Sequence, residues 1–286
     1  MRARPRARLR AVRERELERL RRLAGFYVAV ARTAVQEQFQ YRVANYAYML
    51  GMITEPIVYL VVWSTVARSQ GGSVGGYTPA QLAAYYIVWT LVRNVNIVFT
   101  PFGWEWRIRE GTLSGMLLRP VHPIHYDLAY FAGWKLPVVV MWLPLAVVLS
   151  FAFHPAIAVT PAKAAAFFLA IWGAYLIRSM FMWVLGMITF WTTRVSAIYM
   201  TYFTLELLLS GRIVPLGLMP PWARTLASFL PYKWTFGFPI ETLAADLGGA
   251  ELLTGLGAQA LWTAAGVALV AVVWRFGVRR YAAVGN

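Results

Sequence analysis

The sequence predicts an all-α integral membrane protein with six transmembrane helices, and three observations support this prediction. Hydrophobic residues make up 59% of the 286 residues and charged residues only 14%, whereas soluble domains are about 45–50% apolar and about 25% charged. The chain contains six apolar stretches, most of them near the ~20 residues that a helix needs to cross the hydrocarbon core. Arginine is concentrated in alternate loops, as expected when one side of the membrane retains positive charge.

The six apolar stretches set the expected spans. We expect them near residues 46–67, 79–103, 128–151, 163–190, 196–211 and 258–275. The fourth stretch is long and the fifth is short, so their boundary is expected within WTTRVS at 191–196. Six spans place both ends of the chain on the same side of the membrane.

The distribution of arginine and lysine predicts which side this is. Residues 1–45 hold 12 arginines, and further basic residues on that side are Arg107, Arg109, Arg119, Arg194, Arg275, Arg279 and Arg280. The opposite side has Arg68, Lys163, Arg212, Arg224 and Lys233. Positively charged short loops stay in the cytoplasm, so both termini are expected there. The net charge of +15 is then mostly a topology signal and does not favour nucleic-acid binding.

The first 24 residues predict a basic amphipathic arm. They contain 10 arginines and 3 glutamates, and four apolar residues fall roughly on one helical face, namely Leu9, Val12, Leu20 and Leu23. Such a helix suits a surface of anionic lipid, and a solvated tail that fixes the topology is an equal alternative. Residues 25–45 predict an interfacial helix that leads into the first span.

A polar stretch, WEWRIREGTLSGMLLRPV at 104–121, separates the second and third spans. Residues spaced by 4, 3, 4 and 3 positions share one helical face, namely Trp104, Ile108, Gly111, Gly115 and Leu118. Pro120 and Pro123 end the helix. The stretch therefore predicts one short cytoplasmic helix, which is either a docking surface or a solvated connector.

Charged residues inside the spans form a second group of candidates, because an ionised group in the bilayer is costly unless it is paired or hydrated. Glu55 and Arg93 are expected at similar depth on adjacent antiparallel helices, so we predict that they pair, either along a translocation pathway or as a packing contact. Asn96 flanks Arg93. Arg178 and Glu206 are less well matched in depth and stay individual candidates. Lys135 is expected to reach the membrane surface.

Several classes of chemistry find no support in the sequence. The chain has no cysteine, which excludes disulfides and cysteine-ligated zinc. His122 and His125 lie in a proline-flanked loop without a companion ligand, so we expect no metal site. None of the three lysines follows a glycine, so the phosphate-binding G-x-x-x-x-G-K-[ST] pattern is absent. A membrane-embedded enzyme would have only His122, His125 and Asp127 to use.

The segment 212–257 contains five prolines and therefore cannot form one continuous helix. LMPPWARTLASFL and PIETLAADL are each apolar but too short to cross the membrane. They predict short re-entrant or interfacial helices on the external side, with an ordinary loop as the alternative.

Several stretches carry a resemblance to a known family. IREGTLSGMLLRPV at 108–121, YRVAN at 41–45, GGYTPAQLAAYY at 75–86, SGRIVPLGLMPPWARTLASFLPY at 210–232 and RRYAAVGN at 279–286 resemble the ABC-2 type transporter permeases. The similarity is to the six-span, daunorubicin/multidrug-exporter-like subfamily that pairs with a separate ATPase. It covers residues 25–286 as one permease domain and leaves the arm at 1–24 outside.

The resemblance implies that the polar stretch at 104–121 is a coupling helix that contacts a nucleotide-binding subunit. The candidate contact residues are Arg107, Ile108, Arg109, Glu110, Gly111, Leu113 and Gly115. The candidates for lining the pathway remain Glu55, Arg93, Asn96, Arg178 and Glu206.

The resemblance also implies the partners and the place of action. A homodimer of ATPase subunits would bind ATP and magnesium, so this chain would bind no cofactor directly and would not itself be an enzyme. A second permease, identical or paralogous, would complete the transporter in the bacterial inner membrane. The substrate would be a hydrophobic, drug-like, lipid or glycan compound moved outward by alternating access. The alternative is an ion-coupled carrier or channel that uses Glu55, Arg93 and Arg178.

Overall fold

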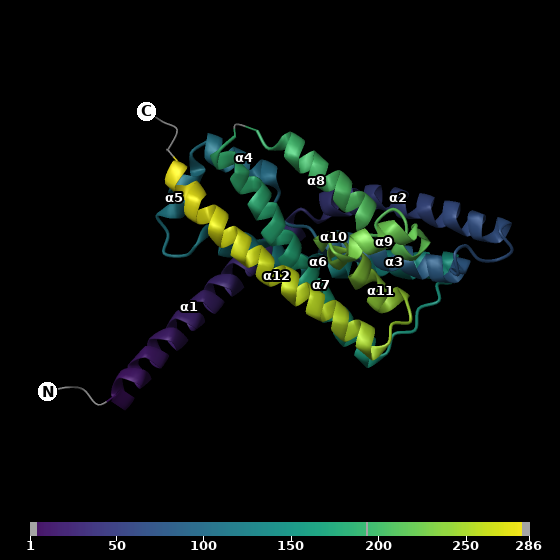
Figure 1. Cartoon of the computed structure of the whole chain (residues 1–286), viewed down its shortest axis with the longest axis horizontal. Helices are drawn as coiled ribbons and strands as arrows, with labels where there is room; N and C mark the ends of the chain where they lie inside the picture. The colour runs from purple at the N-terminus through teal and green to yellow at the C-terminus, as the bar shows by residue number, and fades with distance from the viewer. Residues whose placement is uncertain (1–4, 193, 282–286) are drawn as a thin grey trace.

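The protein is an all-helical bundle with one long helix projecting from it (Figure 1). This computed structural model describes residues 5–192 and 194–281, and within those ranges it has no β-strand. Three parts of the predictions lie outside the described residues. They are the first four residues of the predicted arm, Thr193 in the predicted boundary between the fourth and fifth spans, and the last five residues of RRYAAVGN.

Within the described residues, seven helices are longer than 13 residues and form the body and the projection. They are α1 (Pro5–Gln40), α2 (Arg42–Ser69), α3 (Pro79–Val95), α6 (Pro123–Phe153), α7 (Pro161–Met187), α8 (Ser196–Leu209) and α12 (Gly249–Gly277). Three of them are long and apolar enough to cross a membrane, namely α6, α7 and α12, where α7 and α12 are counted together with the 3-10 turns that follow them. Helix α8 is apolar but shorter. The all-α membrane fold is therefore confirmed, whereas the number of six spans stays a prediction.

Local sequence signals explain where several of these helices begin. Thr78 caps α3 by accepting a hydrogen bond from the Gln81 backbone N–H at 3.3 Å, and the Gln81 side chain accepts one from the Thr78 N–H at 2.9 Å. Thr160 caps α7 in the same way through Lys163 N–H at 3.2 Å. Proline occupies the first helical position in α3, α6 and α7, where its missing N–H costs nothing.

The second predicted span is wrong at its far end. Helix α3 stops at Val95, residues 97–100 are not helical, and a separate helix α4 (Pro101–Arg109) follows. Pro101 cannot supply the N–H that a continuous helix would need there. The apolar character of residues 97–103 made a broken segment look like one span.

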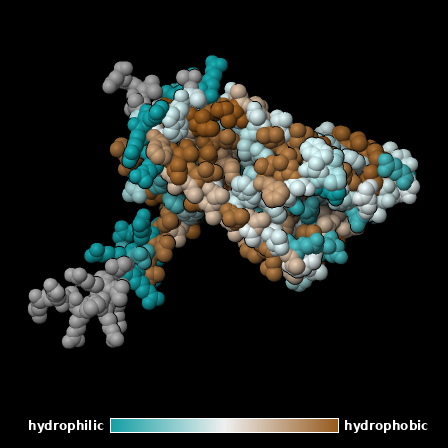
Figure 2. Space-filling view, viewed as in Figure 1, coloured by the Kyte–Doolittle hydropathy of each residue, from teal (hydrophilic) through white to brown (hydrophobic). Residues whose placement is uncertain are grey.

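The interior of the bundle is centred on α7, which packs against α4, α10, α11 and α12. Glycine allows α12 to approach closely, because a Cβ at Gly266 would lie 2.7 Å from the Met180 side chain. Helix α1 lies across α6 with its C-terminal half, and its N-terminal half projects beyond the bundle on the same side of the view as α4, α5 and the C-terminus (Figure 1). Figure 2 shows hydrophobic surface over the middle of the bundle and hydrophilic surface along one flank of the projecting helix.

Three short helices connect α8 to α12, namely α9 (Pro221–Ser228), α10 (Pro231–Thr235) and α11 (Gly237–Ala244). At about 1.5 Å per residue, none spans more than about 12 Å, so the expectation of short helices in segment 212–257 is confirmed. Trp234 and Phe238 are buried against α7 and α12. Helices α10 and α11 are packed elements of the bundle, whereas α9 buries only Ala223 and Ala227 and leaves Trp222 exposed.

Candidate functional site

The polar stretch between α3 and α6 forms two short helices rather than the single helix predicted. Helix α4 ends at Arg109, and α5 (Thr112–Leu117) begins after Gly111, whose φ of 70° is in the left-handed region that favours glycine. The change of direction breaks the shared face that the spacing predicted. We call residues 101–117 the elbow.

The inner side of the elbow is fixed by an aromatic cluster. Trp104 is fully buried, and its ring centroid lies 4.5 Å from that of Trp183 on α7 and 6.2 Å from that of Trp274 on α12. Gly186 makes room for Trp104, since a Cβ there would lie 2.4 Å from the Trp104 side chain. Leu113 of α5 is fully buried in the same cluster. The elbow therefore packs directly on two of the helices long enough to cross the membrane.

A buried ion pair attaches the elbow to α6. The two guanidinium nitrogens of Arg107 donate to the two carboxylate oxygens of Asp127 at 2.8 and 2.7 Å. Both residues are buried, and the guanidinium also lies 3.9 Å from the centroid of the Phe99 ring. Such two-pronged contacts are among the stronger hydrogen bonds in proteins. Arg107, named as a candidate for contact with a partner, is an internal anchor in this structure.

Two further contacts attach the elbow to α8 and to the C-terminal segment. Glu105 accepts hydrogen bonds from Arg109 at 3.2 Å and from the backbone N–H of Val195, the residue before α8, at 3.4 Å. The Tyr281 hydroxyl lies 2.9 Å from the Ser114 hydroxyl. The elbow is thus connected to five parts of the chain.

The outer side of the elbow is exposed. Of the seven predicted contact residues, Arg109, Glu110 and Gly115 are exposed, Ile108 and Gly111 are partly buried, and Arg107 and Leu113 are buried. Leu118, just after α5, is 88% exposed. A partner can therefore reach only part of the predicted set.

The predicted pair of Glu55 and Arg93 is confirmed. The Arg93 guanidinium on α3 donates to the Glu55 carboxylate on α2, and the Tyr59 hydroxyl donates to the same carboxylate at 3.1 Å. The guanidinium carbon also lies 5.1 Å from the centroid of the Trp89 ring. The side chains of Glu55 and Arg93 stay 35% and 19% exposed, so this pair borders the surface of the chain.

We expect the Glu55–Arg93 pair to behave as a coupled unit. Glu55→Gln and Arg93→Gln should each destabilise the protein, and the double variant should lose about 1–3 kcal/mol less than the sum of the two. Unfolding in detergent, followed by intrinsic fluorescence, measures the three differences. Additive losses would show that the two charges do not stabilise one another.

Arg178 and Glu206 also pair, which corrects the expectation that they act separately. The Arg178 guanidinium donates to both oxygens of the fully buried Glu206 carboxylate at 3.1 and 3.2 Å. The two residues lie at comparable distances from the connection between α7 and α8, which brings them level in the antiparallel pair. Arg212 adds a second cation, 3.7 Å from the same carboxylate. Two arginines thus share one buried acid.

Two cations also hold the end of α3. Arg178 donates to the Asn96 carbonyl at 2.6 Å, and Lys135 donates to the Val95 carbonyl at 2.7 Å. The last carbonyls of a helix have no partner within it and carry its negative dipole end, so positive side chains stabilise this position. Lys135 is buried and lies 3.6 Å from the centroid of the Tyr175 ring. The expectation that Lys135 reaches the surface was wrong.

Sequence reasoning missed residues that hold the far end of α8. Tyr85 and Tyr86 on α3 donate to the carbonyls of Gly211 and Ile213 at 2.7 and 2.8 Å. Gly211, with φ of 85°, lets the chain turn so that Arg212 points back toward Glu206. From the sequence, Arg212 is expected only on the external side of the membrane. No sequence pattern links Tyr85 and Tyr86 to Gly211, which lies 126 residues after Tyr85, so this contact could not be predicted from the sequence.

A comparison with known protein families identifies the family of the chain. A family model described as ABC-2 family transporter protein matches residues 53–285. The chain belongs to this family. No curated protein matches the sequence.

Membership in the family defines the general role of the chain. It is the membrane permease subunit of an ABC transporter, and the family implies a partnering ATPase subunit. The matched range begins inside α2 and excludes all of α1. The permease therefore carries its basic arm outside the part that the family shares.

His122 is a titratable group of the permease that the family role does not use. Its Nδ1 accepts a hydrogen bond from the Ile124 N–H at 3.3 Å, and its ring packs on Trp274 with centroids 4.3 Å apart. Burial, with a smaller contribution from nearby His125, lowers the pKa of His122 to about 4. Within the described part of the chain, no group of three His, Cys, Asp or Glu side chains is close enough to hold a metal.

We expect His122 to make the permease less stable in mild acid. An unfolded histidine has a pKa of about 6.5, so the unfolded state binds the proton more readily than the folded state as the pH falls from about 6.5 towards 4. His122→Asn keeps a capping side chain without the titration and should reduce the fall in melting temperature between pH 7 and 5. An equal fall in both proteins would contradict this assignment.

Proposed function

We propose that this permease exports a hydrophobic, drug-like, lipid or glycan substrate by alternating access. A separate ATPase homodimer binds ATP and Mg²⁺ and supplies the energy, and a second permease, identical or paralogous, completes the pathway. The complex works in the bacterial inner membrane with both termini in the cytoplasm. This orientation follows from the distribution of arginine across the loops.

The observation that carries the proposal is the two-sided structure of the elbow. Its outer side exposes Arg109, Glu110 and Gly115 to a partner. Its inner side is attached to α6 through Arg107 and to α7 and α12 through Trp104. A displacement imposed on the outer side is therefore transmitted to helices long enough to cross the membrane.

The buried and partly exposed charges have different roles in this proposal. Glu55 and Arg93 remain partly exposed on α2 and α3, which suits a position along the pathway between two permeases. Glu206 and Asn96 are fully buried, and Arg178, whose side chain is 13% exposed, bonds to both of them and so holds α3, α7 and α8 together. We therefore assign pathway contact to the first pair and helix positioning to the second group.

The ion-coupled alternative receives less support. A carrier of that kind needs charged groups that release their partners to a transported ion. Here Glu55 is paired with Arg93 and Glu206 with Arg178, and family membership supplies an ATPase partner instead.

Co-purification tests the proposal directly. The tagged full chain is isolated from its native membrane in mild detergent, and the bound chains are identified by mass spectrometry. We expect a soluble P-loop ATPase with the wild type and its loss from Arg109→Glu/Gly115→Trp. A Cβ at Gly115 would meet no other atom within 4 Å, so tryptophan blocks the outer side without disturbing the interior.

The matched control changes an exposed arginine at the opposite end of the molecule. Arg68→Glu alters the charge by the same amount near the end of α2 and should retain the ATPase. Failure of the wild type to recover any ATPase, or equal recovery with the elbow variant, would refute the proposed coupling surface. A second membrane chain in the wild-type sample would distinguish a paralogous partner from an identical one.

A further inference from the structure

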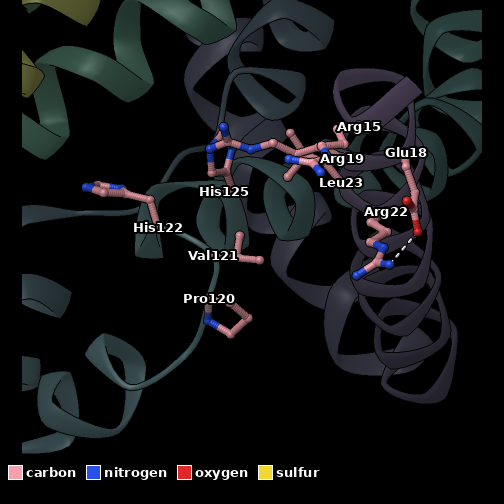
Figure 3. Close-up of a pocket in the computed structure, with 9 residues that line it drawn as sticks. All are labelled: Arg15, Glu18, Arg19, Arg22, Leu23, Pro120, Val121, His122 and His125. Atoms are coloured by element: carbon pink, nitrogen blue, oxygen red, sulfur yellow. Dashed lines mark hydrogen bonds and ion pairs between the residues drawn. The ribbon is translucent and has the colours of Figure 1, made fainter. Parts of the chain in front are cut away.

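A cavity of about 490 Å³ lies between the projecting half of α1 and the connection from α5 to α6 (Figure 3). Helix α1 contributes Arg15, Glu18, Arg19 and Arg22, and the connection contributes Pro120 and Val121. Arg15, Arg19 and Arg22 are spaced by 4 and 3 positions and so share one helical face. The elbow and the ion pairs described above make no use of this cavity.

The cavity has an excess of positive charge. Three arginines face a single glutamate, and that glutamate is already paired with Arg22. Figure 3 shows the side chains of Arg15 and Arg19 reaching from α1 toward His125, while Arg22 turns toward Glu18. Planar guanidinium groups bind phosphate oxygens in pairs. Arg15 and Arg19 are therefore available to bind an anion.

His125 adds a neutral hydrogen-bond donor to the wall of the cavity. Its Nδ1 lies 2.9 Å from the Tyr27 hydroxyl of α1. When that hydroxyl donates to Nδ1, the neutral ring carries its proton on Nε2, the nitrogen that Tyr27 does not occupy.

A second, apolar hollow of about 210 Å³ adjoins the first. The two share Pro120, Val121 and His122, and the second is lined further by Phe26, Met116, Arg119 and Tyr126. A basic chamber beside an apolar one matches a molecule with an anionic head and a hydrocarbon tail. A soluble phosphate would fill only the basic chamber.

The C-terminal half of α1 keeps both hollows in place. A Cβ at Gly133 of α6 would lie 2.5 Å from the Ala31 carbonyl oxygen, and Ala34 is fully buried. The Tyr130 hydroxyl of α6 donates to the Glu37 carboxylate. The hollows therefore lie where a firmly packed helix leaves the bundle.

We propose that this double cavity binds an anionic phospholipid, with its phosphate held by Arg15, Arg19 and His125 and its first acyl carbons lying against Phe26 and Tyr126. The shared chemistry of the candidate ligands is a phosphate ester, and the apolar hollow selects the lipid over a soluble phosphate. The site ties the arm to the membrane surface beside the elbow. It does not depend on the proposed export function or on the ATPase.

Native mass spectrometry of the purified full chain tests this site. Phosphatidylglycerol and phosphatidylcholine are each titrated into the wild type, Arg15→Gln/Arg19→Gln, and the charge-matched control Arg68→Gln/Arg224→Gln. We expect phosphatidylglycerol to bind the wild type and the control alike and the cavity variant about tenfold more weakly, the size expected for the loss of charged hydrogen bonds. The substituted arginines are exposed, so all three proteins should share one melting temperature.

Soluble probes separate the two sources of phosphate. Glycerol 3-phosphate and inorganic phosphate should bind at least tenfold more weakly than phosphatidylglycerol, and Phe26→Asn should weaken the lipid alone. Binding of glycerol phosphate as tight as that of the lipid would overturn the lipid assignment. Equal binding of phosphatidylglycerol by the cavity variant and the control would overturn the site itself.

Discussion

Glu206→Ala is expected to lower the free energy of unfolding by about 3–5 kcal/mol. The Glu206 carboxylate is fully buried and is paired with both Arg178 and Arg212. Its removal leaves the buried Arg212 and the mostly buried Arg178 without a counterion, and a buried unpaired charge is among the most costly changes that one substitution can make. Because Arg178 also holds the end of α3, the damage should extend beyond α8.

Equilibrium unfolding in mixed micelles, followed by tryptophan fluorescence, measures this loss. Glu206→Gln keeps the shape and one oxygen acceptor for Arg178, so it should lose less than the alanine variant. Glu14→Ala removes an exposed acid on α1 and should change stability by less than about 0.5 kcal/mol. A loss for Glu206→Ala no larger than that of this control would show that the two arginines find other partners.

The second large effect is expected at Gly186, where the elbow meets α7. A Cβ at this position would lie 2.4 Å from the side chain of Trp104, which is fully buried. Gly186→Leu should therefore push α4 away from α7. Since the outer residues Arg109 and Glu110 are unchanged, the ATPase should still bind, but substrate-stimulated ATP hydrolysis should fall at least tenfold.

Reconstituted ATPase and transport assays, together with co-purification, distinguish binding from coupling. Gly257→Leu on α12 is the matched control, because this exposed glycine has no neighbour in the way of a Cβ. Trp104→Ala in the Gly186→Leu background should recover part of the activity by returning the lost space. Full activity of Gly186→Leu would mean that the contact of Trp104 with α7 does not transmit the motion.

Much of the fold was predictable, because long apolar stretches leave a plain signal. The predicted second and fourth spans begin at residues 79 and 163, and α3 and α7 begin at Pro79 and Pro161. The end of α3 was not predictable. Residues 97–103 are apolar enough to extend the helix, and the groups that stabilise an end at Val95, Lys135 and Arg178, come from α6 and α7.

The candidate site was predicted in part for a similar reason. Glu55 and Arg93 lie on consecutive antiparallel helices, so counting residues was enough to place them together. Placing Arg212 beside Glu206 required knowledge of the left-handed turn at Gly211. A glycine permits such a turn, but its presence in the sequence does not predict one. Gly111 had the same ambiguity, because its spacing fits a helical face whereas its conformation breaks the helix.

The two cation–carbonyl bonds at the end of α3 have a mechanical consequence. They attach the end of α3 directly to α6 and α7, and the elbow is attached to the same two helices through Arg107 and Trp104. A displacement of the elbow should therefore move α3, α6 and α7 together. In the proposed cycle, we expect these three helices to tilt as one rigid group when the elbow is displaced.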